Sequence, residues 1–313
     1  MKIFKITFVI LAATMSLASC KKEEVDLSQI PNITALGGDT WAAGPIDKWI
    51  ADTLTTPFNI AVKYKWDQFE DLADITKTLV PPDEAVIVPI LSAVKKVWID
   101  SYINEASLGF FKNISPKFFY LIGSPAYESN GGIKLGVAEG GRKIILLNMN
   151  EIKMKGMPGY QLSDSNLSKQ MFHTIHHEFA HIMHQNVIYP VEFKNINPNL
   201  ITANWQDYYD YSLQNPELPA WRDGFISAYA MNTNDDDFVE TVSLLLVNGQ
   251  GWFDDLLASI PAGVSDRGTT QQQAITRLRT KESIVVTYFK EVYGIDFYKL
   301  QSRVRGAIES VIY

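Results

Sequence analysis

All five histidines of the chain stand in one twelve-residue window, and this window constrains the fold more than any other feature of the sequence. It reads H-T-I-H-H-E-F-A-H-I-M-H and begins at His173. Within it, His177, Glu178 and His181 form the pattern H-E-x-x-H. Residues four apart lie on the same face of a helix, so the two outer histidines can bind one metal ion. The window therefore predicts a helix, placed at Ser163–Gln185, with a zinc site on one face.

A catalytic zinc ion takes three protein ligands and a water molecule, and the pattern supplies two of these ligands. Glu178 stands beside them and can act as general base on the water. His184 lies on the same face, but three ligands from one straight helix are hard to arrange around a tetrahedral ion, so His184 is expected beside the site. Downstream, the segment Tyr229–Glu240 places carboxylates at the start of a helix, where they also suit the helix dipole.

The two segments together resemble the glutamate-zincin pattern of the anthrax lethal-factor type. In that family a tyrosine is followed seven residues later by the metal-binding glutamate, and here Tyr229 is followed by Asp236 and then by F-V-E in register. The resemblance implies Asp236 as third ligand and Tyr229 as a donor to the oxyanion. Aspartate is one methylene shorter than the glutamate of the family, so Glu240 and then His184 stay open as alternatives.

The N-terminal segment predicts export. Lys2 and Lys5 precede an apolar run, Ile6–Leu17, which is too short for a stop-transfer helix and is typical of a signal peptide. It ends in L-A-S-C, which resembles the bacterial lipobox, with the only cysteine, Cys20, as the lipidated residue. The predicted parts are a signal peptide at 1–19, a charged tether at 20–35 and a zinc metallopeptidase domain at 36–313.

Strand patterns precede the histidine window and helical patterns follow it. The expected strands are Asn59–Trp66, Phe118–Ile122 and a hairpin of Ile133–Ala138 with Lys143–Asn148. The expected helices are Asp39–Leu54, Val86–Ala106, Ser163–Gln185, Trp221–Ala230, Asp235–Val247, Gln271–Tyr293 and Phe297–Ile312. This order predicts an α+β, zincin-like fold in which a mixed sheet packs on the H-E-x-x-H helix and the C-terminal part is helical.

The whole arrangement resembles the zinc metallohydrolase lipoproteins of Bacteroidetes that are associated with substrate import. The lipobox, the stretch H-E-F-A-H-I-x-H-Q and the stretch D-F-x-E carry the resemblance. It implies a surface-exposed outer-membrane lipoprotein with one Zn²⁺ that cleaves peptides or glycopeptides for nutrient uptake. It also implies a TonB-dependent uptake receptor and its lipoprotein as partners.

Two other functions stay open at this stage. One is a non-catalytic component that uses the zincin fold to bind substrate for an uptake system, and the other is a cell-wall amidase. The intact His177, Glu178 and His181 favour a catalytic role. The net charge of −7, without a basic cluster, excludes a nucleic-acid partner.

Overall fold

The structure, a computed structural model, describes residues 43–65, 79–127, 133–134, 136–139 and 143–313. The chain divides into two units, Met1–Ala43 and Gly44–Tyr313, and nearly all described residues belong to the second. The predicted signal peptide, Cys20 and the tether lie outside the described residues. None of the described helices is both long enough and apolar enough to cross a membrane.

A four-stranded mixed sheet packs against the histidine-bearing helix. The strands β1 (Ala61–Lys63), β2 (Phe118–Leu121) and β6 (Lys143–Leu146) run parallel in the order β1-β2-β6, and β5 (Gly136–Glu139) pairs antiparallel with β6. The predicted hairpin is therefore confirmed in its pairing. Its first strand was predicted too long, because Ile133–Lys134 forms a separate strand, β4, which pairs with β3 (Ala126–Tyr127).

The helices before the site surround a large aromatic core. The predicted helix Val86–Ala106 is confirmed as a continuous run of α5 (Glu84–Val94), a π-helical turn η3 (Lys95–Ile99) and α6 (Asp100–Glu105). Trp98 of this run is fully buried, and its ring meets those of Phe111, Phe119 and Phe179. Ring contacts of this kind join the helix, the sheet and the histidine-bearing helix into one core. The other helices of this part are α2 (Pro45–Ile50), continued by η2 (Ala51–Thr55) and α3 (Thr56–Phe58), and α7 (Leu108–Ile114).

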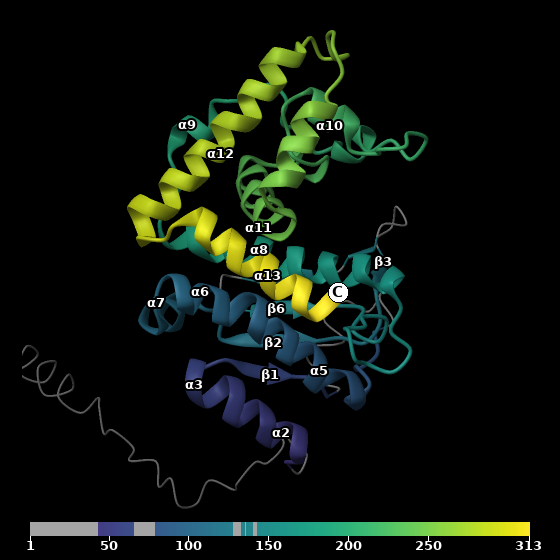
Figure 1. Cartoon of the computed structure of the whole chain (residues 1–313), viewed down its shortest axis with the longest axis vertical. Coiled ribbons are helices and arrows are strands. Elements are labelled where there is room, and N and C mark those ends of the chain that lie inside the picture. Colours follow the sequence, from purple (N-terminus) through teal and green to yellow (C-terminus); the bar gives the residue numbers. More distant parts are fainter. Residues whose placement is uncertain (1–42, 66–78, 128–132, 135, 140–142) are drawn as a thin grey trace, which may run out of the picture. The chain divides into compact units, whose positions relative to one another are not determined.

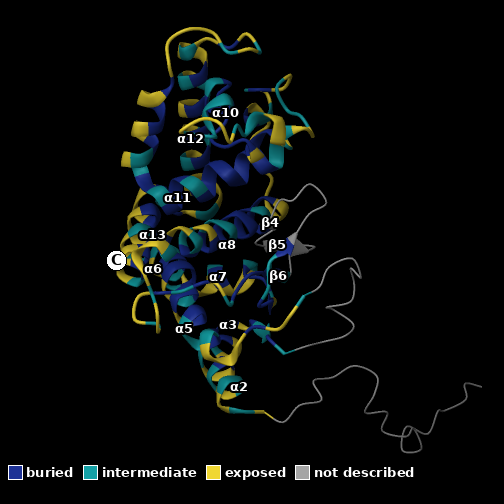
Figure 2. Ribbon diagram, turned by 90° about the vertical axis from the view of Figure 1, so that its right-hand side faces the viewer, coloured by how far each residue is buried: buried dark blue, intermediate teal, exposed yellow. Residues whose placement is uncertain are grey.

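The histidine-bearing helix α8 (Ser165–Asn186) occupies the middle of the unit, after a short 3-10 turn η4 (Leu162–Asp164). The sheet lies on one side of α8, and α11 (Asn234–Ser259) packs on the other (Figures 1 and 2). Both helices are buried along most of their length, as the dark blue ribbon in Figure 2 shows. Side chains at their crossing are therefore placed by packing on several sides.

The C-terminal part is helical, as predicted. The helices α12 (Gln271–Tyr293) and α13 (Phe297–Ile312) have the predicted bounds. The shorter elements are α9 (Val191–Lys194), η5 (Trp205–Tyr208), α10 (Leu218–Arg222) and η6 (Tyr229–Met231). The predicted helix Trp221–Ala230 is wrong, because α10 ends at Arg222 and Gly224 adopts a φ of +82°. A Cβ at Gly224 would lie 2.8 Å from Cβ of Arg277, so glycine is required there.

Candidate metal centre

The crossing of α8 and α11 brings together three of the predicted ligands. Asp236 Oδ1 lies 3.5 Å from Nε2 of His181 and 4.0 Å from Nε2 of His177. One ligand atom from each of these residues lies within 4.8 Å of the other two. A zinc ion with bonds of about 2.0–2.2 Å needs donors that are about 3.3 Å apart, so small inward shifts complete the geometry. Two imidazoles and one carboxylate are a donor set that zinc accepts, and the residues therefore fit the ion.

The other ring nitrogen of each histidine is also engaged. His177 Nδ1 lies 2.7 Å from Glu240 Oε1, and His181 Nδ1 lies 2.9 Å from His184 Nε2. An ionised carboxylate can only accept, so His177 Nδ1 carries the proton and its Nε2 lone pair is left for a metal. Glu240 and His184, the two alternative third ligands, thus lie on the far side of the histidine rings from Asp236.

Asp236 is oriented by the residues that begin α11. Thr233 caps the helix by accepting from the Asp236 backbone N–H, and its hydroxyl donates to Asp236 Oδ2 at 2.7 Å. Asn232 donates to the same oxygen at 2.8 Å. Burial opposes ionisation of Asp236, but hydrogen bonds from His181, Thr233 and Asn232 outweigh it and hold the pKa of this carboxyl below its usual range. With Oδ2 occupied, Oδ1 is the atom that faces the histidines.

Glu240 is the centre of a second buried network. Its Oε1 accepts from His173 Nε2 at 2.8 Å as well as from His177, and its Oε2 accepts from the Ser227 hydroxyl at 2.5 Å. Burial opposes ionisation here too, but the two histidines reverse the effect and hold the pKa of Glu240 well below its usual range. A second set of possible metal ligands, whose donor atoms also lie within 4.8 Å of one another, consists of His173, His177 and Glu240. That second group lacks His181, so the first group is the better match to H-E-x-x-H.

Glu178 and Tyr229 lie beside these ligands. The Glu178 side chain belongs to α8 and is 8% exposed, and within the described residues no hydrogen bond or ion pair engages its carboxylate. The Tyr229 ring lies 5.7 Å from the His177 ring and 5.0 Å from that of Trp205, and it is 37% exposed. The catalytic roles of Glu178 and Tyr229 stay predictions.

Sequence reasoning missed the polar side chains that hold the site. Thr233 had a local signal, because a threonine three residues before an acidic residue is typical of a helix start. Ser227 and Asn232 had none, since their partners are defined only by the fold. His176, by contrast, is a packing residue: burial lowers its pKa to about 3, and its ring stacks on Tyr102.

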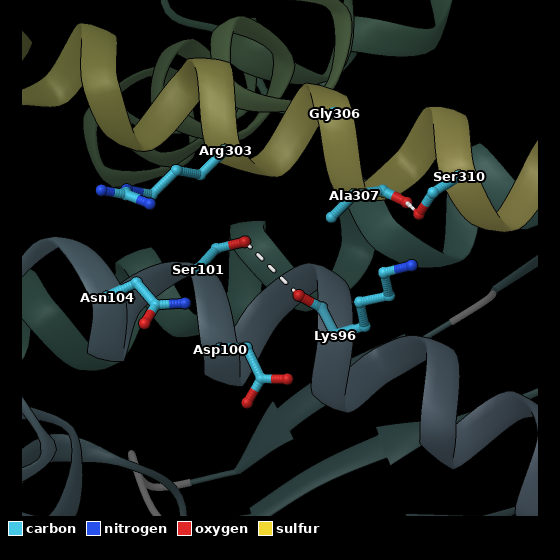
Figure 3. Close-up of a pocket in the computed structure, with 8 residues that line it drawn as sticks. All are labelled: Lys96, Asp100, Ser101, Asn104, Arg303, Gly306, Ala307 and Ser310. Carbon is cyan, nitrogen blue, oxygen red and sulfur yellow. Dashed lines mark hydrogen bonds between the residues drawn. The ribbon is translucent and has the colours of Figure 1, made fainter.

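An open pocket of about 450 Å³ lies elsewhere, between the η3–α6 run and α13 (Figure 3). It is lined by Lys96, Asp100, Ser101, Asn104, Arg303, Gly306, Ala307 and Ser310. None of these residues belongs to α8 or α11, so the pocket is not part of the candidate metal centre.

Comparison with known proteins gives two matches. A family model described as "Putative zinc-binding metallo-peptidase" matches residues 39–298. The crystal structure of a protein from Bacteroides caccae, described in the same words, superimposes with a TM-score of 0.64 and 24% sequence identity, covering 87% of this chain and 99% of that one. At this identity the likeness establishes the fold, which is mixed α/β, mostly helical and with a small, largely parallel sheet. No curated protein matches the chain significantly.

Proposed function

The chain belongs to the zinc-binding metallopeptidase family whose model covers residues 39–298, and on this premise we propose that it hydrolyses peptide bonds. Zinc is the metal of this family. The observation that carries the proposal is the position of Asp236 Oδ1, which faces Nε2 of both His177 and His181. Two helices remote in sequence thus present three zinc donors to one point. Under this proposal His177, His181 and Asp236 hold the ion.

The roles of the neighbouring side chains follow from their places. When bound, zinc lowers the pKa of a coordinated water towards neutrality and polarises a carbonyl oxygen. Glu178, with its carboxylate not engaged by other described groups, accepts the proton of the attacking water and delivers it to the leaving amine. Tyr229 donates a hydrogen bond from its hydroxyl to the developing oxyanion. Glu240 and His184 orient the imidazole rings of His177 and His181.

The test compares wild type with Glu178→Gln on casein, mucin glycopeptides and peptidoglycan fragments. Glutamine keeps the shape but cannot accept the proton, so we expect a loss of about 10²–10⁴-fold in rate with zinc retained. Glu192→Gln, an exposed change of the same kind on α9, is the control and should keep wild-type activity.

The three substrates separate the possible functions. Cleavage of casein or glycopeptides supports the peptidase, and cleavage of peptidoglycan fragments alone would identify a cell-wall amidase. Equal rates for wild type and Glu178→Gln on every substrate would leave a non-catalytic binding component. Elemental analysis should find one zinc ion per chain, which is lost in His177→Ala and in His181→Ala.

We also propose that the protein is a lipoprotein of the outer-membrane surface that supplies peptides to an uptake receptor. The support is Cys20 at the end of an apolar leader segment. The wild-type protein should fractionate with the outer membrane and carry a lipid on Cys20, whereas Cys20→Ser should not be lipidated. Mass spectrometry of the mature N-terminus decides this, and an unlipidated N-terminus at another residue would contradict it. Digestion of intact cells by added protease tests the surface location.

A further inference from the structure

A lysine ammonium group is buried against the first turn of α11, the turn that carries Asp236. Lys281 of α12 is 0% exposed, and its Nζ lies 2.6 Å from Asp237 Oδ2, 2.9 Å from Asp237 Oδ1 and 2.9 Å from the carbonyl oxygen of Gly224. It also lies 4.1 Å from the centre of the Phe225 ring. Removing a charge from water is costly unless it is paired, and an apolar pair of similar volume often stabilises a protein equally well. General stability alone is therefore a weak reason for this arrangement.

The two partners of Lys281 belong to the two segments that build the site. Asp237 is buried in the first turn of α11, directly after Asp236, whose carboxylate faces α8. Gly224 begins the segment that leads to Ser227 and Tyr229. Through Asp237, the ammonium group of Lys281 connects α12 to the turn that carries Asp236. Through the Gly224 carbonyl, it connects α12 to the segment that carries Ser227 and Tyr229.

Two further side chains hold the backbone directly before Gly224. Arg277, one turn earlier on α12, donates to the carbonyl oxygen of Asp223 at 3.1 Å and to the Thr269 hydroxyl at 2.8 Å. Asn197 donates to the same Asp223 carbonyl at 2.8 Å. The backbone at 223–224 is thereby held from two directions, while the first turn of α11 has Lys281 as its ionic contact with α12.

We propose that Lys281 is a positioning residue for the metal centre. It acts through Asp237 to fix the first turn of α11, so that Asp236 Oδ1 stays against the histidines. It acts through the Gly224 carbonyl to fix the segment that carries Ser227 and Tyr229. The inference rests on the proposed function in one respect, the assignment of Asp236 as a ligand.

The test separates positioning from stability by comparing Lys281→Met with the double variant Lys281→Met/Asp237→Asn in the purified protein. The single change leaves a buried carboxylate unpaired and should lower the melting temperature of the metal-free protein. The double change removes both charges and should recover much of that loss. Zinc affinity, measured by competition with a chromophoric chelator, should stay about 10–100-fold weaker than wild type in both variants, the range found for residues that support ligands.

The controls make each outcome decisive. Lys299→Met removes a solvent-exposed partner of Asp296 on α13 and should change neither quantity. A double variant with recovered stability and wild-type zinc affinity would overturn the inference. If Lys281→Met does not fold, zinc affinity is measured in Asp237→Asn alone. Wild-type zinc affinity in that folded variant would also overturn the inference. Zinc that persists in His177→Ala would instead contradict the proposed function, so the two failures are distinguishable.

Discussion

In both His177 and His181, each of the two ring nitrogens has a polar neighbour, and the neighbours of Nε2 and Nδ1 differ. This difference separates the three candidates for the third ligand. The Nε2 atoms face Asp236, whereas the Nδ1 atoms are hydrogen-bonded to Glu240 and His184. A carboxylate or imidazole on Nδ1 raises the basicity of the ring and fixes its orientation. This difference in position supports our proposal that Asp236, and not Glu240 or His184, is the third ligand.

Substitution at these positions should reveal that difference. Asp236→Ala is expected to lower zinc affinity and rate together, because under our proposal it removes a ligand. His184→Ala should leave zinc affinity within about tenfold of wild type, at the low end of the effect of a supporting residue. Asp235→Ala removes the same charge from the same turn and is the control. Loss of zinc in His184→Ala or Glu240→Ala but not in Asp236→Ala would reverse the assignment.

The residues that sequence could place are those whose relation is local. His177 and His181 are four apart in one helix, so their shared face follows from helix geometry alone. The contact of Glu240 with His177 Nδ1 depends on how α8 and α11 cross, and the crossing is set by side chains from the whole core. Sequence therefore predicted both carboxylates but could not say which side of the ring each one meets.

At the scale of elements, prediction succeeded where the ends of helices carry their own signals. Thr270 caps α12 and forms a capping box with Gln273, and Gly294 ends the helix in a left-handed conformation. The helix Asp235–Val247 was predicted to end two residues before Gly249, and the helical backbone is interrupted at Gly249. Beyond this kink α11 continues to Ser259 as a second helical part that was not predicted, and this part buries Phe253, Leu256 and Leu257.

The kink in α11 gives a matched pair of glycine substitutions. Gly249 has φ +83° and ψ 174°, and a Cβ there would lie 3.3 Å from the Arg305 side chain, so Gly249→Ala should destabilise the fold by about 1–3 kcal/mol. Gly251 has open space around its Cα, and Gly251→Ala should stabilise the helix by about 0.5–1 kcal/mol. Chemical denaturation measures both, and equal effects would show that the kink is not required.

For the whole molecule, a metal ion bound at the proposed centre would link α8, which packs on the sheet, to α11 of the helical part. Binding to the folded state alone stabilises it by about 4 kcal/mol when the free ligand is a thousandfold above its dissociation constant. Chelation should therefore lower the melting temperature of the wild-type protein, and added zinc should restore it. His177→Ala is the control: a chelator that lowers its melting temperature equally would act elsewhere than at the centre.

Between α8 and α11 the chain passes through an exposed tip, where Tyr211 is 87% exposed. Exposed tips are where breaks in a polypeptide are best tolerated. A cut there would divide the protein into one fragment with the sheet and both histidines and another with the aspartate, so neither alone would hold the full donor set. Co-expressed as separate chains, the fragments would become a two-part system whose reassembly is reported by zinc capture.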